Sequence, residues 1–493
     1  MNKKLSLKEK DRLFFSTVAE AAFINPFTRE RLDLDKKITG LKAGASWDEL
    51  VEQVTETIRR RLRELKNSGQ ADPAAYNTDD RDLLRTAFLF DIFHDYRNSF
   101  DELILRQIKS GDAPIQVRFA HDLLSRISGL GFTAQESKRY LEIFFQMRRA
   151  FYFIENGLTG PSPSMQALRS RLWDNIFTSN IARYEKHLWD RMEDFSTLML
   201  GETGTGKGAA AAAIGRSGYI PFDERKGYFA DSFTRTFIAI NLSQYPEALL
   251  ESELFGHKKG AFTGAIENHE GIFSRCSPYG SIFLDEIGDV SIPVQIKLLQ
   301  VLQERTFSPV GSHEKLRFRG RVIAATNRPL DELRRKGEFR DDFYYRLCSD
   351  IIVVPPLRQR INEEPKELES LTAKILQRLT GDASLPYIQL VQNVVSRDLG
   401  NTYAWPGNVR ELEQAIRRII VTRHYYGDKS ISSENTEIEF LKGIKEGTIN
   451  AEVLLSGYCK SLYRRWGTYE EVARRTNLDR RTVKKYISQT NNE

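Results

Sequence analysis

Two short stretches of this 493-residue chain carry residue types suited to phosphate chemistry. The first, GETGTGKG at 201–208, follows the apolar run STLML and precedes an alanine-rich segment. Glycines let a loop turn tightly and aim its N–H groups at phosphate oxygens, and the next helix N-terminus adds partial positive charge. We therefore predict ATP binding, rather than a flexible turn, by Gly201, Glu202, Thr203, Gly204, Thr205, Gly206, Lys207 and Gly208.

The second stretch, GSIFLDEIGD at 280–289, is an apolar strand pattern that ends in two adjacent carboxylates. Open α/β sheets bind ligands at the carboxyl ends of their strands. Asp285 is suited to hold Mg²⁺ through water, and Glu286 to polarise the attacking water. Two such acids alone would be typical of a solvated turn, but the upstream loop favours ATP hydrolysis. Gly208 stands where a hydroxyl usually meets Mg²⁺, so the ion would depend on other ligands or water.

The surrounding sequence alternates between strand and helix patterns. Short apolar runs occur at 196–200, 236–241, 280–286 and 321–327, with helical stretches such as 292–305 between them. This alternation indicates βαβ units around a parallel sheet. Helical patterns return after VPPLRQR at 354–360.

Residues 1 to about 160 have a different texture, with apolar residues at helical spacing, as at 50–65, 82–100 and 138–154. The break GLTGPSPS at 157–164 marks the predicted boundary.

Composition limits the class of protein. Apolar residues make up 40% and charged residues 28% of the chain, and the net charge is +6. No run reaches the roughly 18 apolar residues of a membrane span, and the basic start lacks the apolar core of a signal peptide. The three cysteines (Cys276, Cys348, Cys459) are far apart, which argues against a structural zinc site. We expect a cytoplasmic protein without a membrane segment.

Several motifs in a fixed order carry a resemblance to a known family. They are SPSMQALR, GETGTGKG, LLESELFGHKKGAFTGA, GSIFLDEIGD, QIKLLQVLQE, AATN, GEFRDDFYYRL, VPPLRQR and WPGNVRELE. From about Pro163 to Arg418 the chain resembles the AAA+ ATPases that activate bacterial RNA polymerase carrying sigma-54, the enhancer-binding proteins.

The resemblance gives the GAFTGA stretch a role. Phe262 is a large apolar residue on a glycine-flanked loop, which calls for a partner. In this family the loop is driven by ATP and touches sigma-54, so the resemblance implies contact through Gly260, Ala261, Phe262, Thr263, Gly264 and Ala265 rather than an ordinary surface turn.

Further roles are implied position by position. Arg340 and Arg346 match the arginines that a neighbouring subunit offers to the γ-phosphate. Asn327 matches the sensor of that phosphate, and Arg410 the second sensor, on the helical lid. Asn241 matches the residue that holds the catalytic glutamate, with a capping asparagine as the alternative.

The chain departs from the family at two places. Gly208 replaces a common Glu, and the segment 216–236 is longer than usual. The longer segment could be a surface elaboration or a subunit contact.

The basic C-terminal run GTYEEVARRTNLDRRTVKKYI at 467–487 reads as helix, turn, helix. Thr468 and Glu471 fit a capping box, and Asp479 a cap of the second helix. The run resembles the family's helix-turn-helix, which implies contact with double-stranded DNA, rather than packing on protein, by Arg480, Arg481, Thr482, Lys484 and Lys485.

We therefore predict four regions: a helical regulatory region at 1–160, an α/β AAA+ ATPase core with a parallel sheet at 161–356, a helical lid at 357–435 and a helix-turn-helix domain at 436–493. The resemblance implies an ATP- and Mg²⁺-dependent activator of sigma-54 RNA polymerase that assembles from dimers to a hexamer. The alternatives are a DNA-binding repressor that does not use sigma-54, and an AAA+ machine that remodels another protein.

Overall fold

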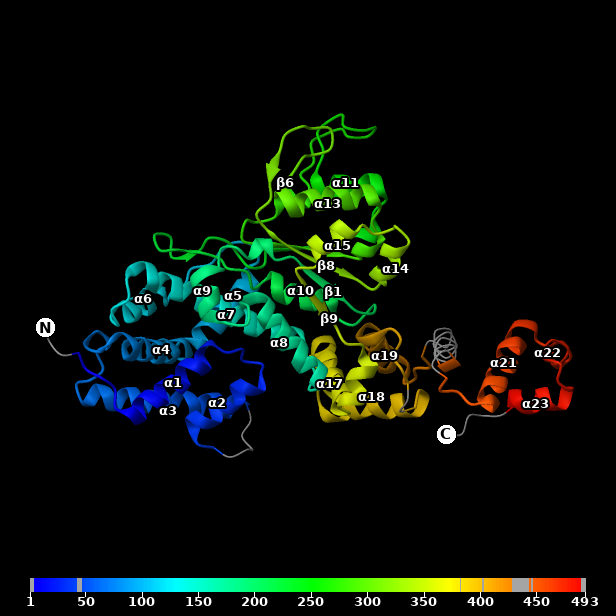
Figure 1. The fold of residues 1–493 in the computed structure, drawn as a ribbon, viewed down its shortest axis with the longest axis horizontal. Coiled ribbons are helices and arrows are strands. Elements are labelled where there is room, and N and C mark those ends of the chain that lie inside the picture. The colour runs from blue at the N-terminus through cyan, green and yellow to red at the C-terminus, as the bar shows by residue number, and fades with distance from the viewer. Residues whose placement is uncertain are drawn as a thin grey trace. The chain divides into compact units, whose positions relative to one another are not determined.

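The computed structural model describes residues 4–41, 47–381, 383–400, 403–427, 443–444 and 447–488 (Figure 1). The predicted boundary at 435–436 and the two ends of the chain lie outside these residues. The chain divides into two units, the first formed by 1–388 with 407–413 and the second by 389–406 with 414–493.

The N-terminal region is helical, as predicted. Its longer helices are α1 (Glu9–Phe23), α2 (Arg29–Thr39), α3 (Trp47–Asn67), α4 (Thr78–Asp95), α5 (Arg97–Ser110), α6 (Ala120–Ser128) and α7 (Ala134–Gly157). The helix predicted over 82–100 is interrupted at Tyr96, which ends α4 and precedes α5. A capping box at Thr133 and Glu136 begins α7, and pairs of this kind satisfy N–H groups that the first helical turn leaves open.

Five parallel strands form the central sheet in the order β4-β5-β8-β1-β9. They are β1 (Thr197–Leu200), β4 (Phe237–Asn241), β5 (Ser281–Asp285), β8 (Arg321–Thr326) and β9 (Asp350–Val353). Four of them match the predicted apolar runs. The sequence analysis missed β9 because two of its four residues are exposed, which hides the signal of a buried strand.

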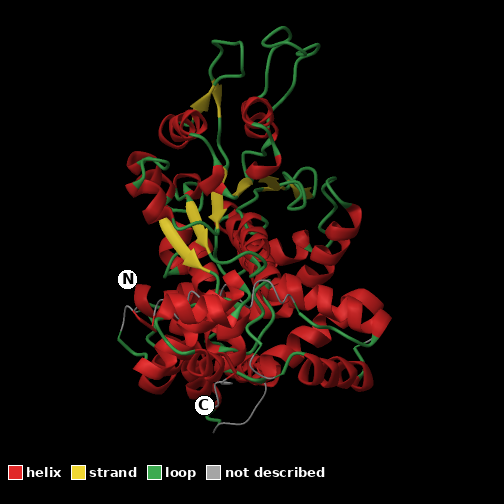
Figure 2. Ribbon diagram, turned by 90° about the vertical axis from the view of Figure 1, so that its right-hand side faces the viewer, coloured by secondary structure: helices red, strands yellow, loops and turns green. Residues whose placement is uncertain are grey.

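Helices cover the strands of the sheet (Figure 2), and side chains along each strand alternate between the two faces of the sheet. Met199, Phe283 and Ile323 pack in one hydrophobic cluster with α7, α8 (Pro163–Phe177) and α10 (Lys207–Gly215). Leu198, Leu284 and Ala324 point into a second cluster with α11 (Glu247–Phe255), α13 (Ile292–Glu304) and α15 (Asp341–Leu347). Because both faces are covered, the strands read as apolar runs rather than as alternating patterns.

The longer segment 216–236 packs inside the chain. It contains a small antiparallel pair, β2 (Phe222–Asp223) and β3 (Tyr228–Phe229). Phe229 stacks on Phe145 of α7 with ring centroids 4.2 Å apart, and Phe233 meets Phe153 of α7 at 5.4 Å. The segment is therefore the surface on which the N-terminal helices pack, an arrangement that the sequence analysis did not consider.

Polar side chains of α7 also reach the end of α10. The fully buried guanidinium of Arg149 donates to the carbonyl oxygens of Arg216 and Gly218, both at 2.7 Å. Gln146 Nε2 donates to the Ser217 carbonyl at 2.9 Å and to the Tyr184 hydroxyl at 2.8 Å. These bonds satisfy backbone carbonyl groups of residues 216–218, directly after the last residue of α10.

Shorter elements complete the first unit. They are η1 (Pro73–Ala75), α9 (Ile181–His187), η2 (Met192–Asp194), η3 (Leu242–Gln244), α12 (Ile272–Arg275), η4 (Ile287–Asp289), β6 (Thr306–Phe307), β7 (Leu316–Arg317), α14 (Leu330–Arg335), α16 (Leu357–Glu363) and α17 (Lys366–Thr380). Two further helices, α18 (Leu385–Asp398) and α19 (Asn408–Thr422), follow in the predicted lid region.

The C-terminal end forms three helices, α21 (Ala451–Trp466), α22 (Tyr469–Thr476) and α23 (Arg480–Ser488), around buried Cys459, Val472 and Val483. The sequence analysis identified the last two and missed α21. Asp479 Oδ1 accepts from the backbone N–H groups of Arg481 and Thr482 at 2.9 and 3.0 Å, so it caps α23 as predicted.

The predicted capping box at Thr468 is wrong. Thr468 stands at the N-cap of α22, but its side chain makes no capping hydrogen bond. The Glu471 carboxylate accepts instead from Arg474 and Arg475, at 2.7 and 2.9 Å. The neighbouring guanidinium groups compete with the backbone for this acid.

None of the helices in the described part of the chain has the length and apolar character of a membrane span.

Candidate nucleotide-binding site

The loop between β1 and α10 turns at three glycines. Gly201, Gly204 and Gly206 have φ angles of 157°, 81° and 107°, which glycine adopts without strain. A Cβ on Gly204 would lie 2.3 Å from the Gly407 carbonyl oxygen and 3.0 Å from the Arg410 Cβ. The loop therefore requires glycine at 204 for close approach of the chain, as well as for its turn.

Lys207 begins α10 with its side chain buried. Its Nζ donates to the carbonyl oxygens of Gly201 at 2.8 Å and Glu202 at 3.1 Å. Burial lowers the pKa of Lys207, and the Glu286 and Asp285 carboxylates oppose this shift. An ammonium group held by loop carbonyls can exchange them for phosphate oxygens without leaving its place.

Glu286 directly follows β5 in a strained position. Its φ is 57°, a left-handed conformation that costs a residue with a side chain about 1–2 kcal/mol. Its buried Oε2 has no hydrogen-bond partner within the described residues. Burial raises the pKa of Glu286, and the charge of Asp285 adds to this shift. Strain together with an unsatisfied buried oxygen is typical of a residue positioned for chemistry.

Asn327 follows the neighbouring strand β8. Its Nδ2 donates to Thr203 Oγ1 at 2.8 Å, and its backbone hydrogen-bonds the Glu286 carboxylate. The carboxyl ends of β1, β5 and β8 thus bring the phosphate loop, the acid pair and Asn327 to one edge of the sheet, as predicted for strands of a parallel sheet.

Two residues that the sequence analysis missed hold the loop. Asn408 Nδ2 donates to Glu202 Oε2 at 3.2 Å and to the Thr203 carbonyl at 3.1 Å, while its Oδ1 accepts from the Leu357 N–H at 2.8 Å. The Arg358 guanidinium donates to both Glu202 oxygens and lowers the pKa of that carboxyl. Both lie within quoted motifs, so the signal was present, but their loop contacts depend on the fold.

Arg410 also reaches the loop. Its backbone N–H donates to the Gly204 carbonyl at 3.3 Å, and its charge further lowers the pKa of Lys207. The Arg410 guanidinium is therefore near enough to influence the charge of Lys207. Its predicted role as a sensor stays a prediction.

The two predicted arginine fingers make other contacts. Arg340 forms a bidentate ion pair with Asp342 at 2.7 and 3.0 Å, and Arg346 Nε donates to the Leu302 carbonyl at 3.0 Å. Arg340 is also 40% exposed. Neither contact involves the phosphate loop, which is the geometry needed if these residues serve a neighbouring subunit.

Asn241 ends β4 in register with Asp285. Its Oδ1 accepts from the Ser243 N–H at 3.0 Å and from the Ser243 hydroxyl at 2.8 Å. These are the contacts of a capping asparagine, the alternative interpretation. Its predicted role toward Glu286 stays a prediction.

The edge of the sheet offers a limited set of metal ligands. Among the described residues no group of three His, Cys, Asp or Glu side chains could hold an ion. Asp285 and Glu286 are adjacent in the chain. Gly208 of the phosphate loop is exposed and has open space around it, because an added Cβ would have only one neighbour within 4 Å, Phe283 at 3.9 Å. Two carboxylates beside open space suit Mg²⁺, which keeps several waters and binds phosphate oxygens.

The GAFTGA loop is held at its base and open at its tip. The Gly260 N–H donates to the Ala265 carbonyl at 2.8 Å, and Ala265 is buried. Phe262 is 37% exposed and rests edge-on against the His257 ring at 4.9 Å, while Thr263 is exposed. The chain beyond α11 and beyond β6 forms the loops at the top of Figure 1.

Comparison with known proteins finds similarity in the part of the chain that contains this site. Residues 179–352 match the Sigma-54 interaction domain. The Nif-specific regulatory protein of Azotobacter vinelandii is 36% identical over 62% of this chain and 53% of its own length. The hydrogenase transcriptional regulatory protein HoxA of Cupriavidus necator is 41% identical over 46% of this chain and 43% of its own. A solved structure of NtrX from Brucella abortus with ADP is 19% identical, with a TM-score of 0.41 over 72% of this chain and 75% of that one.

The chain thus spans about half the length of the curated relatives that it matches. The matched segment, 179–352, contains the phosphate loop, the acid pair, Asn327, both predicted fingers and the GAFTGA loop. The segment 179–352 therefore resembles the Sigma-54 interaction domain, and the relatives that it matches are transcriptional regulatory proteins.

Proposed function

We propose that this protein hydrolyses ATP to activate transcription by RNA polymerase carrying sigma-54. The observation that carries the proposal is that one matched segment contains the phosphate loop and acid pair at the sheet edge together with a GAFTGA loop whose Phe262 is partly exposed. A hydrolysis site alone would fit any ATPase, and the loop supplies the specific output.

Each residue of the site has a chemical task in this proposal. Lys207 exchanges its loop carbonyls for the β- and γ-phosphates. Glu286 uses its unsatisfied oxygen to orient the attacking water, and its raised pKa makes it a stronger acceptor for a proton. Asp285 would hold Mg²⁺ through water, and the ion would supply positive charge to the phosphates. Asn327 and Arg410 read the nucleotide from β8 and α19.

The ring assembly follows from the arginines. Arg340 and Arg346 do not contact the phosphate loop of their own chain in any described contact, so a neighbouring subunit would receive them. A guanidinium that neutralises developing phosphate charge contributes about 10³–10⁵-fold to such reactions. We propose a homo-oligomer, up to a hexamer, with ATP between subunits.

The remaining regions have supporting roles. We propose residues 1–160 as a regulatory region, 161–356 as the ATPase core, 357–435 as its lid and 436–493 as a DNA-binding domain. The last assignment is supported by α23, which is capped by Asp479 and carries exposed Arg481, Lys484 and Lys485. Binding of double-stranded DNA through these cations should weaken as salt rises.

Transcription in vitro tests the proposal. The full chain, sigma-54 polymerase and a supercoiled promoter template should give open complexes with ATP and none with a non-hydrolysable analogue. ATP hydrolysis without any open complex would contradict the proposed output and favour a repressor or a different protein target.

A loop variant separates hydrolysis from output. Thr263→Ala should retain ATP turnover, because Thr263 is exposed and makes no described contact with the phosphate loop, and should lose open-complex formation. Thr57→Ala on α3 is the matched control and should change neither. Normal activation by Thr263→Ala would remove the loop tip from the mechanism.

A further inference from the structure

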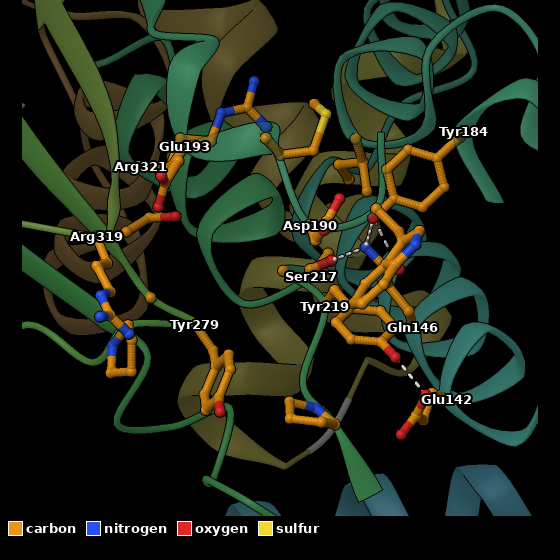
Figure 3. A pocket seen from close by; sticks show the side chains of 18 of the residues that line it. Glu142, Gln146, Tyr184, Asp190, Glu193, Ser217, Tyr219, Tyr279, Arg319 and Arg321 are labelled. Atoms are coloured by element: carbon orange, nitrogen blue, oxygen red, sulfur yellow. Dashed lines mark hydrogen bonds between the residues drawn. The ribbon is translucent and has the colours of Figure 1, made fainter. Parts of the chain in front are cut away.

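A cavity of about 630 Å³ lies at the opposite edge of the sheet from the nucleotide site. Its walls come from α7, from the turn at 217–221 after α10, from η2 and from the segments that enter β5 and β8. The volume falls within the roughly 300–1,000 Å³ typical of small-molecule sites. Figure 3 shows Arg319 and Tyr279 on one side of the opening, and Tyr219, Gln146 and Tyr184 on the other.

The lining carries more positive than negative groups. Its five cations are Lys138, Arg139, Arg317, Arg319 and Arg321, and its three carboxyl groups are Glu142, Asp190 and Glu193. The described contacts give Lys138, Arg317 and Arg319 no ion pair or side-chain hydrogen bond. Lys138 acts on the Glu142 carboxylate, whereas Arg317 and Arg319 have no ion-pair partner among the described contacts, so an anion bound near these two arginines would gain charge attraction.

Of the other charged groups of the lining, Arg321, Arg139 and Glu142 are engaged, while Asp190 and Glu193 make no ion pair or side-chain hydrogen bond among the described contacts. Arg321 donates from Nε to the Phe195 carbonyl at 2.8 Å, and Arg139 lies over the Trp189 ring at 4.5 Å. The Glu142 carboxylate accepts from the Phe222 N–H at 2.8 Å, and burial raises the pKa of Glu142. Arg321, Arg139 and Glu142 shape the cavity, whose lining keeps more cations than carboxylates, and Arg317 and Arg319 are left to meet a ligand.

Aromatic rings supply a second recognition element. Tyr279 is 37% exposed and makes no side-chain hydrogen bond among the described contacts. Across the cavity, Trp189 and Tyr219 contact each other with centroids 4.6 Å apart. At the buried end, Gln146 and Tyr184 exchange hydrogen bonds at 2.8 and 3.0 Å. Apolar rings with a few placed polar groups are typical of sites for small organic molecules.

We propose that this cavity binds a small organic anion built on a planar ring, with its charged group between Lys138, Arg317 and Arg319 and its ring against Tyr279. The shared chemistry fits an aryl phosphate or an aryl carboxylate. The site goes beyond the proposed function, because it requires neither ATP hydrolysis nor sigma-54.

The position of the cavity gives such a ligand a structural effect. One wall belongs to α7 of the N-terminal region, and the other to the strands β5 and β8 of the ATPase core. The same strands end, at their far edge, in Glu286 and Asn327. A ligand that touches both walls stabilises their packing by an amount that grows with its concentration over its Kd.

Binding measurements on the full chain test the proposal. The probes are 1-naphthyl phosphate and 2-naphthoate, with neutral 2-naphthol and inorganic phosphate as comparisons, all titrated by calorimetry with saturating ADP present. ADP keeps the phosphate loop occupied, so it cannot capture the probes. At least one naphthyl anion should bind, and the better of the two identifies the source of the charge.

Variants then locate the binding. Arg317→Ala combined with Arg319→Ala should weaken the naphthyl anion at least about tenfold, since two charge contacts are lost, and Tyr279→Ala should weaken it less. Arg60→Ala, on α3 away from the cavity, should have no effect. No binding of either anion at millimolar concentration, equal binding of 2-naphthol, or equal affinity of the double variant would each overturn the proposal.

Discussion

The two edges of the central sheet contain similar buried polar side chains, but these side chains differ in whether their hydrogen bonds are satisfied. At the carboxyl edge, Glu286 is strained and its Oε2 lacks a partner among the described residues. At the amino edge, Gln146 and Glu142 are bonded to the backbone of 217–222. A satisfied polar group fixes a fold, whereas an unsatisfied one stores free energy for a ligand or a reaction. The difference supports the proposal that the carboxyl edge performs chemistry, whereas the amino edge joins two parts of the chain around the cavity.

The largest expected effect concerns the reactive edge. Glu286→Gln should lower ATP turnover by about 10²–10⁴-fold, because an amide cannot accept the proton of the attacking water. Phosphate release measures turnover, and a fluorescent ATP analogue should show that nucleotide still binds. Glu332→Gln on α14 is the exposed control. Turnover within about twofold of the parent would mean that another residue accepts the proton of the attacking water.

The next effect concerns the joining edge. Phe229→Ala removes a ring that is 4% exposed and stacks on Phe145. A buried Phe→Ala change lowers the free energy of unfolding by about 3–5 kcal/mol, which urea denaturation measures. Phe262→Ala, on the partly exposed loop, should leave stability nearly unchanged. Equal stability of the two variants would mean that 216–236 does not hold the N-terminal helices.

Two glycines sharpen the description of the phosphate loop. Gly204→Ala should weaken ATP binding at least about tenfold, because its Cβ meets the Gly407 carbonyl at 2.3 Å and its φ of 81° costs about 1–2 kcal/mol. Gly208→Ala meets no atom closer than 3.9 Å, so affinity should stay within about twofold. Calorimetric titration with an ATP analogue compares them. A reversed order would mean that the loop changes course when nucleotide binds.

The smallest expected effects are pH-dependent changes in stability, and they have opposite signs for two glutamates of α7, Glu142 and Glu136. Burial raises the pKa of Glu142, so its ionisation destabilises the fold progressively as pH rises above the unfolded value. Glu142→Gln should therefore gain stability relative to the parent as pH rises above the unfolded pKa of Glu142. The Thr133 N–H lowers the pKa of Glu136, so Glu136→Gln should lose stability above the unfolded pKa and approach the parent as pH falls. Thermal unfolding at several pH values measures both.

Residue patterns predicted the reactive edge better than the joining edge. The phosphate loop, the acid pair and Asn327 lie together because a parallel sheet brings consecutive strand ends to one edge. Asn408 and Arg358 were missed because they reach Glu202 from segments about 206 and 156 positions away, and no local period encodes such a contact. The same reason explains the packing of 216–236 on α7. The prediction of a capping box at Thr468 was wrong because the Glu471 carboxylate bonds to Arg474 and Arg475 instead of to the backbone.

The short connection between α7 and α8 contacts the ATPase part of the chain, so removal of the N-terminal region would also break contacts there. Arg360 and Glu367 form a buried ion pair, and Glu367 Oε2 accepts from the Ser162 N–H at 3.0 Å while Arg360 donates to the Thr159 carbonyl at 2.8 Å. A chain cut at residue 160 would lose the Thr159 acceptor and expose the phenylalanines of 216–236 to water. Such a fragment would be expected to aggregate, so the influence of the N-terminal region on the ATPase is better measured by point substitutions within α7 than by deletion.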